Sequence, residues 1–335
     1  MGTYIKGISY YLPEKVYTNE EISTQHPEWS IEKISSKTGI KARHIAAEDE
    51  YASDMAISAS LKLFEEYSIQ PDEIEFVLYC TQSPDYFLPT TACILQDRLG
   101  IQITAGALDY NLGCSGYIYG LSLAKGLIES KQVNNVLLIT SETYSKYIHP
   151  NDKSNKTIFG DAASATLIGS DKGIFEIKNF SFGTNGKGAE NLIVKNGGVR
   201  NRFQLGKDIT DAEGNYISND SCLYMNGSEI FSFTSQAVPV LVNDVIQRNH
   251  LSFEEVDYFL FHQANKYMLD FIRRKINIPQ EKFVYYIENV GNTVSSTIPI
   301  ALKEAVNQDM NYKKGLLAGF GVGYSWAGCI IERVG

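Results

Sequence analysis

Two stretches of the chain, "NLGCSGYIYGLSLAKGLIES" (111–130) and "NVGNTVSSTIPIALKEAVNQ" (289–308), decide the fold because they repeat one pattern. In each, a glycine turn is followed at once by a chemically useful side chain and then by an apolar segment of helical character. Cys114 and Asn292 occupy the same place in the two stretches. Because the repeats of solenoid proteins are far shorter than this separation, the pattern predicts a single duplicated unit.

The repeat extends into the flanking segments. "PDEIEFVLYCTQS" (71–83) and "FEEVDYFLFHQAN" (253–265) both run from an acidic turn through an apolar strand to a polar exit, at nearly the same separation as the first pair. "NNVLLIT" (134–140) and "KKGLLAG" (313–319) match in the same way. Short apolar strands that alternate with helices indicate a sheet covered on both faces, so the chain is predicted to be an α/β protein.

The duplication divides the chain into two predicted halves. The N-terminal half, 1–172, carries Cys114, and the C-terminal half, 173–335, carries Asn292. No Pro/Ser-rich linker separates them, so we expect the halves to share one body. The segment from about 195 to 225 matches nothing in the first half, which predicts an insertion or a mobile loop there.

The composition is that of a globular protein and argues against several functional classes. The formal net charge of −9 argues against a nucleic-acid binder. No apolar run reaches the roughly 20 residues that a membrane helix needs, and the N-terminus lacks the features of a signal peptide. The five cysteines are far apart and include no CxxC pair, which argues against a metal site and a disulfide framework. We therefore expect a cytoplasmic protein with reduced thiols and no membrane span.

Cys114 is a candidate nucleophile because it stands at a strand-to-helix turn, at the predicted first position of a helix. The positive end of a helix lowers a thiol's pKa and favours the thiolate. His262 ends the strand "YFLFH", and Asn292 follows the glycine turn of the second repeat. The strand ends of a parallel sheet converge on a crevice, so the three side chains could meet there. Taken singly, a packed thiol, a buried structural histidine and a helix N-cap explain them equally simply.

Seven motifs, in this order along essentially the whole chain, resemble those of the β-ketoacyl-acyl-carrier-protein synthase III family. They are "TGIKARHIA" (38–46), the glycine–cysteine turn (113–116), "FGDAASA" (159–165), "MNGSEIF" (225–231), "HQAN" (262–265), "GNT" (291–293) and "GFGVGYSWAG" (319–328). The resemblance implies a thiolase-like fold, in which two pseudo-symmetric βαβαβ-type halves form a layered αβαβα body. It also implies a homodimer.

The resemblance implies a two-step acyl-transfer chemistry. Cys114 would accept the acyl group, because a sulfur nucleophile both attacks a thioester and leaves it readily. His262 and Asn292 would hold the second thioester and stabilise the enolate that forms when it loses carbon dioxide. The implied reaction is a decarboxylative Claisen condensation with a carrier-bound malonyl or β-ketoacyl thioester. It would serve fatty-acid initiation or a specialised polyketide-like pathway.

Four further positions take implied roles around this chemistry. The backbone around Gly321 and Val322 would form an oxyanion hole with the amide of Cys114, and Phe320 would line the site beside the reacting carboxylate. Leu88 stands where the family has a phenylalanine that reaches across the dimer to cap the acyl pocket. A branched aliphatic residue there points to a different acyl chain.

Several positions bear on how the acyl donor binds. At four positions where the coenzyme A-using members have a tryptophan or an arginine, this chain has Lys33, Lys37, Lys153 and Tyr267. Lysine does not replace arginine where stacking or a bidentate grip is needed, which leaves acyl-CoA and acyl-carrier protein both open as donors. Arg274 and Lys275 match family positions that dock the acidic carrier. No cofactor is implied besides these thioester substrates.

Two alternative functions keep the same fold. In one, the acyl-cysteine passes its acyl group to an alcohol or an amine. In the other, the chain is a non-catalytic partner subunit of a ketosynthase heterodimer, although such subunits typically lose the nucleophile. Thiolases and hydroxymethylglutaryl-CoA synthases place a second cysteine or a glutamate in the site, and the sequence shows no matching motif.

Overall fold

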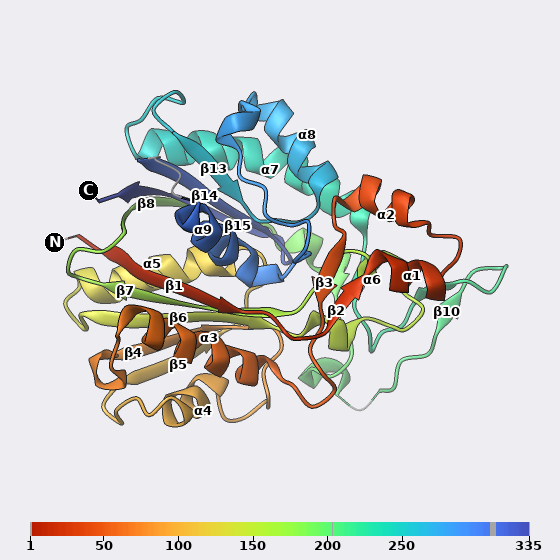
Figure 1. The fold of residues 1–335 in the computed structure, drawn as a ribbon. Helices are drawn as coiled ribbons and strands as arrows, with labels where there is room; N and C mark the ends of the chain where they lie inside the picture. The colour runs from red at the N-terminus through yellow and green to blue at the C-terminus, as the bar shows by residue number, and fades with distance from the viewer. Residues whose placement is uncertain (1, 203, 309–312, 335) are drawn as a thin grey trace.

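A nine-stranded sheet, in the order β13-β14-β15-β8-β1-β7-β6-β4-β5, forms the centre of the computed structural model, which describes residues 2–202, 204–308 and 313–334 (Figure 1). Its strands are β1 (Tyr4–Tyr11), β4 (Phe76–Cys80), β5 (Gly106–Tyr110), β6 (Asn135–Glu142), β7 (Ala162–Gly169), β8 (Phe175–Thr184), β13 (Tyr258–Phe261), β14 (Lys314–Gly321) and β15 (Ser325–Arg333). The sheet is the α/β core that the sequence predicts.

The pairing within the sheet repeats once. In the first part β4 runs parallel to β6, β6 is antiparallel to β7, and β7 is antiparallel to β1. In the second part β13, β14, β15 and β8 are paired in the same directions. The two parts join only where Tyr4 and Ile5 of β1 face Glu176 and Phe175 of β8. This arrangement confirms the predicted duplication.

The longer helices lie in three layers around the two parts of the sheet (Figure 1). Outer helices α3 (Ala52–Tyr67) and α4 (Thr91–Arg98) pack on the first part, while α7 (Gly227–Arg248) packs on the second and contacts α8 (Lys266–Ile276). The remaining pair, α5 (Gly116–Glu129) and α9 (Thr297–Asn307), contacts strands of both parts and forms the middle layer. The layered αβαβα body is therefore confirmed.

Helix α5 shows why the middle layer is apolar on several faces. Its side chains pack against β4 and β6 on one side and against β14 and β15 on the other. Tyr117, Ile118 and Leu121 are fully buried as a result. A helix that is apolar around most of its circumference is stable only in such a doubly covered place.

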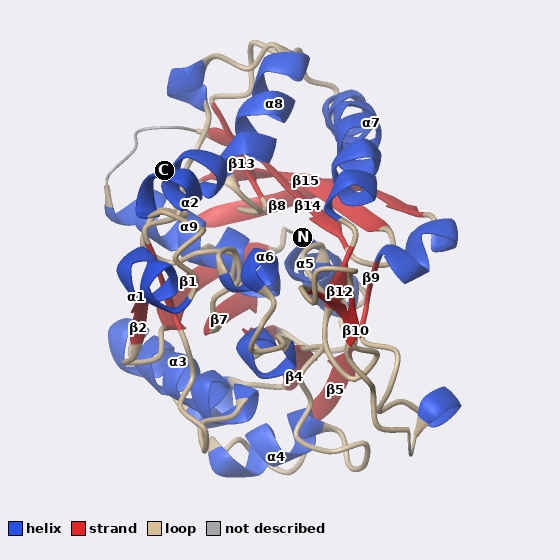
Figure 2. Cartoon of the chain, turned by 90° about the vertical axis from the view of Figure 1, so that its right-hand side faces the viewer, coloured by secondary structure: helices blue, strands red, loops and turns tan. Residues whose placement is uncertain are grey.

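Shorter elements surround the layers, and several gather near the carboxyl ends of the strands (Figure 2). The helices and helical turns are α1 (Asn19–Gln25), α2 (Ile31–Thr38), α6 (Lys153–Lys156), η1 (Pro71–Glu73), η2 (Tyr144–Tyr147), η3 (Gly186–Asn191), η4 (Val199–Asn201), η5 (Gln280–Lys282) and η6 (Val294–Ser296). The strands are β2 (Val16–Thr18), β3 (Ala42–His44), β9 (Leu192–Ile193), β10 (Ile209–Thr210), β11 (Tyr216–Ser218) and β12 (Tyr224–Met225). Among the described residues, no helix has the length and apolar character needed to cross a bilayer.

The segment predicted as an insertion, about 195–225, lies outside the main sheet. Within it β10 pairs with β11, and β12 at its end pairs with β9, so two small sheets form there. A turn closes the first of these sheets, because Asp211 accepts hydrogen bonds from the amides of Glu213 and Asn215 at 3.0 and 2.7 Å. The segment therefore has its own secondary structure.

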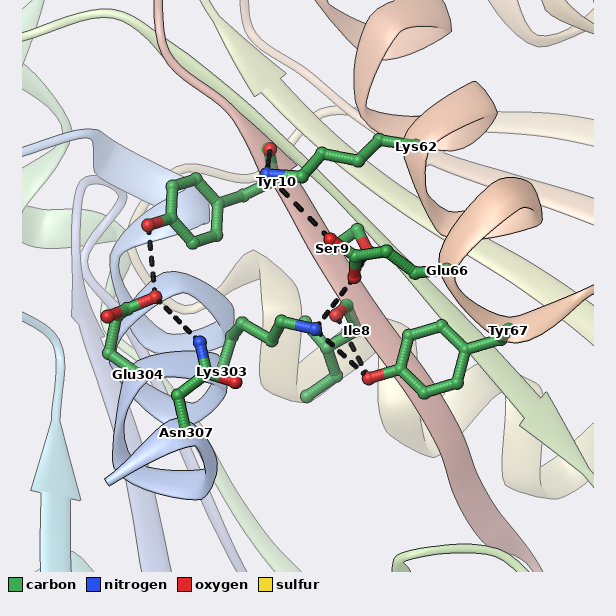
Figure 3. Close-up of polar contacts among 9 residues, drawn as sticks. All are labelled: Ile8, Ser9, Tyr10, Lys62, Glu66, Tyr67, Lys303, Glu304 and Asn307. Atoms are coloured by element: carbon green, nitrogen blue, oxygen red, sulfur yellow. Dashed lines mark hydrogen bonds and ion pairs between the residues drawn. The ribbon is translucent and has the colours of Figure 1, made fainter. Parts of the chain in front are cut away.

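A polar network joins α9 to α3 across β1 (Figure 3). Glu66 of α3 accepts hydrogen bonds from Ser9 at 2.5 Å and from Lys303 of α9 at 2.7 Å. The Lys303 ammonium also donates to the Tyr67 hydroxyl at 3.2 Å, and Tyr10 donates to Glu304 at 3.0 Å. Burial acts to raise the pKa of Glu66, but the bonds from Lys303 and Ser9 outweigh it and hold that pKa below its usual value.

Replacing Lys303 by Met is expected to lower the free energy of unfolding by about 0.5–1 kcal/mol at pH 7, because it removes the nearer of two lysines that pair with Glu66 and leaves Lys62, at 3.9 Å. A depressed folded-state pKa stabilises the protein above the unfolded-state pKa, and this contribution is lost as pH falls through the folded-state value. The difference in the free energy of unfolding between wild type and variant should therefore become smaller in acid. Urea denaturation at several pH values measures it, with the exposed Lys172→Met as control. A gap that stayed constant would contradict the assignment.

Candidate active site

Cys114 lies in the turn between β5 and α5 and is 6% exposed. Strand β14 passes directly over this turn. A Cβ atom added at Gly321 would lie 2.8 Å from the Cys114 sulfur, and one at Gly319 would lie 2.7 Å from the Cys114 carbonyl oxygen. Only glycine allows strand and turn to approach so closely, so the "GFGVG" motif is a packing requirement of the cysteine turn.

His262 follows β13 directly and is buried. Its backbone amide continues the ladder by donating to the carbonyl of Ala318 at 2.8 Å, and its Nδ1 lies 2.7 Å from the hydroxyl oxygen of Thr297. The ring meets Phe320 edge to face, with 5.8 Å between centroids. Burial lowers the pKa of His262 to about 3, so the imidazole is neutral at physiological pH.

Asn292 stands in the turn before η6 and is 4% exposed. Its amide donates to the carbonyl of Ile158 at 2.9 Å, and its side-chain Oδ1 accepts the amide of Val294, also at 2.9 Å. The side chain closes a short turn, but the N-cap of η6 is Thr293, so the interpretation of Asn292 as an N-cap is wrong. Because the oxygen accepts this bond, the Nδ2 group is the part left for a ligand, and it can only donate.

Val294 connects the three residues in space. Its amide bonds to Asn292, its carbonyl accepts from the same Thr297 hydroxyl that lies beside His262, and its side chain would meet a Cβ at Gly113 at 3.4 Å. Gly113 precedes Cys114 in the chain. The structure thus brings the turns of the two repeats and the end of β13 to one place, as predicted from their positions at strand ends.

The sequence predicts a lowered pKa for Cys114, and this prediction is wrong. Burial, followed by the electrostatic effect of Glu142, raises the pKa of Cys114 to about 12, and hydrogen bonds from its own backbone and from Val322 only partly offset this. Helix α5 begins at Gly116, so Cys114 stands before the helix. The positive end of α5 therefore acts on it less directly than the sequence implied.

Glu142, which the sequence analysis missed, is fully buried at the end of β6. Its carboxyl oxygens accept the backbone amide of Gln82 at 3.0 and 3.1 Å, the Ser83 hydroxyl at 3.0 Å, and the Ser295 hydroxyl at 3.4 Å. It therefore joins the exit of β4 to the turn that carries Asn292. Burial raises the pKa of Glu142 to about 8, which keeps it mostly protonated at neutral pH.

Arg43 of the "TGIKARHIA" motif supports the Asn292 turn from behind and is also fully buried. Its guanidinium donates to Asn19 Oδ1 and to the carbonyl of Thr157, both at 2.9 Å. A Cβ at Gly291, whose φ is +72°, would lie 3.0 Å from the Cβ of Arg43. The sequence singled out this motif, but its spacing alone did not show what Arg43 contacts.

Three of the four predicted site-lining residues lie at the site, and the fourth does not. Gly321, Val322 and Phe320 all lie at the site, since Val322 hydrogen-bonds to Cys114 and Phe320 contacts His262. Leu88 is 86% exposed and does not line the cavity that its neighbours Tyr86 and Phe87 help to form. Within one chain it therefore contributes no acyl-pocket wall.

The predicted donor-binding lysines gather around Trp29. The Lys33 ammonium lies 4.9 Å from the centre of the Trp29 ring, and that of Lys37 lies 5.8 Å from it. Lys153 forms an ion pair with Glu28, next to Trp29 in the chain. The tryptophan face and one of the cations are therefore already engaged within the protein.

The three remaining positions lie on α8. Tyr267 is 60% exposed and packs near Phe231, with 5.7 Å between ring centroids. Arg274 donates from Nε to the carbonyl of Asp270, and the Lys275 ammonium lies 5.9 Å from the Phe271 ring. Arg274 and Lys275 thus both lie in the last turn of α8.

Comparison with known proteins gives one consistent result. Residues 108–186 match the family model of 3-oxoacyl-[acyl-carrier-protein (ACP)] synthase III, and residues 246–333 match the model of its C-terminal part. The β-ketoacyl-[acyl-carrier-protein] synthase III of Clostridium perfringens is 34% identical over 97% of this chain and 98% of the relative.

Solved structures agree. A 3-oxoacyl-(acyl-carrier-protein) synthase III is 48% identical, with a TM-score of 0.96 over 99% of this chain and all of the other. The priming β-ketosynthase of the R1128 polyketide pathway is 26% identical, with a TM-score of 0.84 over 99% of this chain and 96% of the other. Fold and site define an acyl-transferring condensing enzyme of the thiolase fold. The chain belongs to the 3-oxoacyl-[acyl-carrier-protein] synthase III family.

Replacing Glu142 by Gln is expected to change how Cys114 responds to pH. Once Glu142 ionises above about pH 8, its charge disfavours the Cys114 thiolate. Alkylation of Cys114 by iodoacetamide should therefore be about 3- to 10-fold faster in the variant at pH 9 and nearly equal at pH 6. Peptide mass spectrometry measures the rate at Cys114, and exposed Cys93 in the same sample is the internal control.

The same variant should change the pH dependence of stability. The folded-state pKa of Glu142 lies above its usual 4.5, so stability present below pH 4.5 is lost as pH rises toward 8. Glutamine carries no such penalty, and the melting temperature of the variant should rise relative to wild type between pH 5 and 9. A fixed offset over that range would contradict the protonated state of Glu142.

Proposed function

We propose that Cys114 accepts an acyl group and that the acyl-enzyme condenses with a carrier-bound malonyl or β-ketoacyl thioester, with loss of carbon dioxide. The observation that supports this most directly is the meeting of a sulfur, a neutral imidazole and a donor-only carboxamide at the seam of the two repeats. Members of this family that are 34% identical carry the name of that activity. Initiation of fatty-acid chains is the role that fits best.

In the first step the Cys114 sulfur attacks the donor's thioester carbonyl. The bond from carbon to the donor sulfur breaks, and the released thiol takes up the proton that Cys114 gave up. Negative charge on the carbonyl oxygen would be met by backbone amides of Cys114 and Val322, which already hydrogen-bond to the sulfur region. These donors are fixed by the close packing of β14 on the cysteine turn.

In the second step His262 and Asn292 would donate hydrogen bonds to the thioester oxygen that becomes the enolate. The Asn292 Nδ2 group can only donate, and the neutral imidazole can donate from one nitrogen. For that nitrogen to be Nε2, the Thr297 hydroxyl must turn its single hydrogen from the Val294 carbonyl to Nδ1. Uncharged donors stabilise the enolate without holding it as an ion pair, so the carbanion can attack the carbonyl of the acyl-cysteine. The bond from that carbonyl to the Cys114 sulfur then breaks, which frees the cysteine and leaves the β-ketoacyl product on the carrier.

We propose acyl-carrier protein as the source of both thioesters. Trp29, Lys33 and Lys37 contact one another, and Glu28 neutralises Lys153, which together leave a poor grip for the nucleotide part of coenzyme A. The cationic ends of Arg274 and Lys275 suit an acidic carrier. No further cofactor takes part in this proposal.

A homodimer in the cytoplasm is also part of the proposal, as is the division into halves at residue 172. Strand β5 is the edge of the sheet, and Leu108 on it is 44% exposed. Phe87 and Leu88 are 71% and 86% exposed, and they come shortly before Thr91 and Ala92, whose amides donate to Asp109 of β5. An unpaired edge beside exposed apolar side chains is the kind of surface that a second copy covers.

Incubation with acyl-carrier protein charged with a short acyl group is expected to add one acyl mass to Cys114, seen by intact and peptide mass spectrometry. Cys114→Ala should show no adduct, and Cys93→Ala should behave as wild type, because Cys93 is an exposed cysteine on α4. Acyl-CoA at equal concentration should label at least tenfold more slowly. Absence of an adduct from both donors would overturn the acyltransferase proposal, and equal labelling would overturn the choice of donor.

Thr297→Val is expected to separate the two steps. Removal of the hydroxyl takes away the group that fixes the His262 tautomer, so carbon dioxide release and condensation should fall by about 10- to 100-fold. Acylation of Cys114 should change less than threefold, because His262 has no part in that step as proposed. Radiolabelled carbon dioxide release and adduct mass measure the two rates. A proportional loss of both would contradict this division of roles.

A further inference from the structure

A cavity of about 780 Å³ opens beside the cysteine turn, lined by the exit of β4, by η2 and by the segment around β9. Val322 and Gln82 belong to its lining and also contact the turn, since a Cβ at Gly113 would lie 2.7 Å from each of their side chains. The cavity therefore begins next to Cys114. Its size is in the range that holds a small organic ligand.

The wall of the cavity nearest Cys114 is polar and centred on Gln82. The Gln82 Oε1 accepts the Tyr144 hydroxyl at 2.5 Å, and its Nε2 donates to Asn111 Oδ1 at 2.9 Å. The Gln82 carbonyl accepts the Tyr147 hydroxyl at 3.1 Å. Its backbone amide is held by Glu142. Every polar group of Gln82 is thus fixed, so the wall is rigid.

Another part of the lining is apolar. It comes from the segment around β9 and from the residue before β12. The residues are Leu192, Ile193, Val194 and Leu223. A hydrocarbon tail fits this side, and burying it there is favourable by the ordinary hydrophobic effect.

The polar wall retains hydrogen-bonding capacity. The described contacts use one of the two hydrogens on Gln82 Nε2, and they use the Tyr144 and Tyr147 hydroxyls as donors, which leaves acceptor lone pairs on both hydroxyl oxygens. The wall can therefore both donate and accept. A hydroxyl does both as well, whereas an alkyl group would only remove water from these atoms.

We infer that this cavity selects acyl groups with a hydroxyl near the thioester end and an apolar tail, that is, 3-hydroxyacyl thioesters over saturated ones of the same length. The inference rests on the proposed function, because it assigns the acyl group that Cys114 receives. Gln82 and Tyr144 determine this specificity. Asp85, which also lines the cavity, acts against acyl groups that end in a carboxylate.

The test compares acylation of Cys114 by acyl-carrier protein charged with a 3-hydroxyoctanoyl or an octanoyl group, at equal concentration, by intact mass against time. Wild type should react about tenfold faster with the hydroxyacyl probe, the discrimination that one well-placed hydrogen-bonding group supplies. Gln82→Met keeps the backbone contacts and nearly the volume of the side chain but removes the amide, so the ratio should fall to about one. Tyr144→Phe, which removes a single oxygen, should lower the ratio in the same direction and covers the case in which Gln82→Met does not fold.

Gln102→Met is the matched control. Gln102 is exposed, its side chain bonds to the Asp72 carbonyl outside the cavity, and its replacement should leave the ratio unchanged. A wild-type ratio of one or below, or a ratio that survives both Gln82→Met and Tyr144→Phe, would overturn the inference while leaving the acyltransferase proposal intact. Absence of any Cys114 adduct with either probe would overturn that proposal, and the inference with it.

Discussion

The close approach of β14 to the cysteine turn is the contact on which the site depends. The two repeats meet there, and they can do so only because positions 319 and 321 have no side chains. The same approach sets the Val322 amide beside the sulfur and Phe320 beside His262. A duplicated fold thus becomes one site through the absence of two Cβ atoms, because neither repeat alone could supply both the Cys114 sulfur and the Val322 amide beside it.

Burial keeps the site uncharged before substrate arrives. It raises the pKa values of Cys114 and Glu142 and lowers that of His262, so thiol, carboxyl and imidazole are all mostly neutral near pH 7. A neutral site can admit an apolar acyl thioester without a desolvation cost for fixed ions. In the proposed reaction charge appears only on oxygen atoms of the substrate and on sulfur, where fixed donors are close by.

The sequence predicted the duplicated α/β fold and the meeting of Cys114, His262 and Asn292, because strand ends and repeat positions are local patterns. The pKa of Cys114 was predicted wrongly, since burial among other side chains is a tertiary property that helix position does not reveal. Glu142 and Gln82 were missed for a related reason. Each follows an ordinary apolar strand, and only the fold places their polar groups against the reactive turn.

Helix α9 connects two features that lie far apart in the structure. Its first residue, Thr297, touches His262, and Lys303 and Glu304 near its other end hold α3 and β1 (Figure 3). The position of Thr297 at one end of α9 therefore depends on the contacts of Lys303 and Glu304 near the other end. Loss of those contacts by heat or acid would let α9 tilt while the sheet stays folded, and the His262 imidazole would lose its orientation. Inactivation of this enzyme would then precede unfolding, with the weak point at the surface, remote from the chemistry.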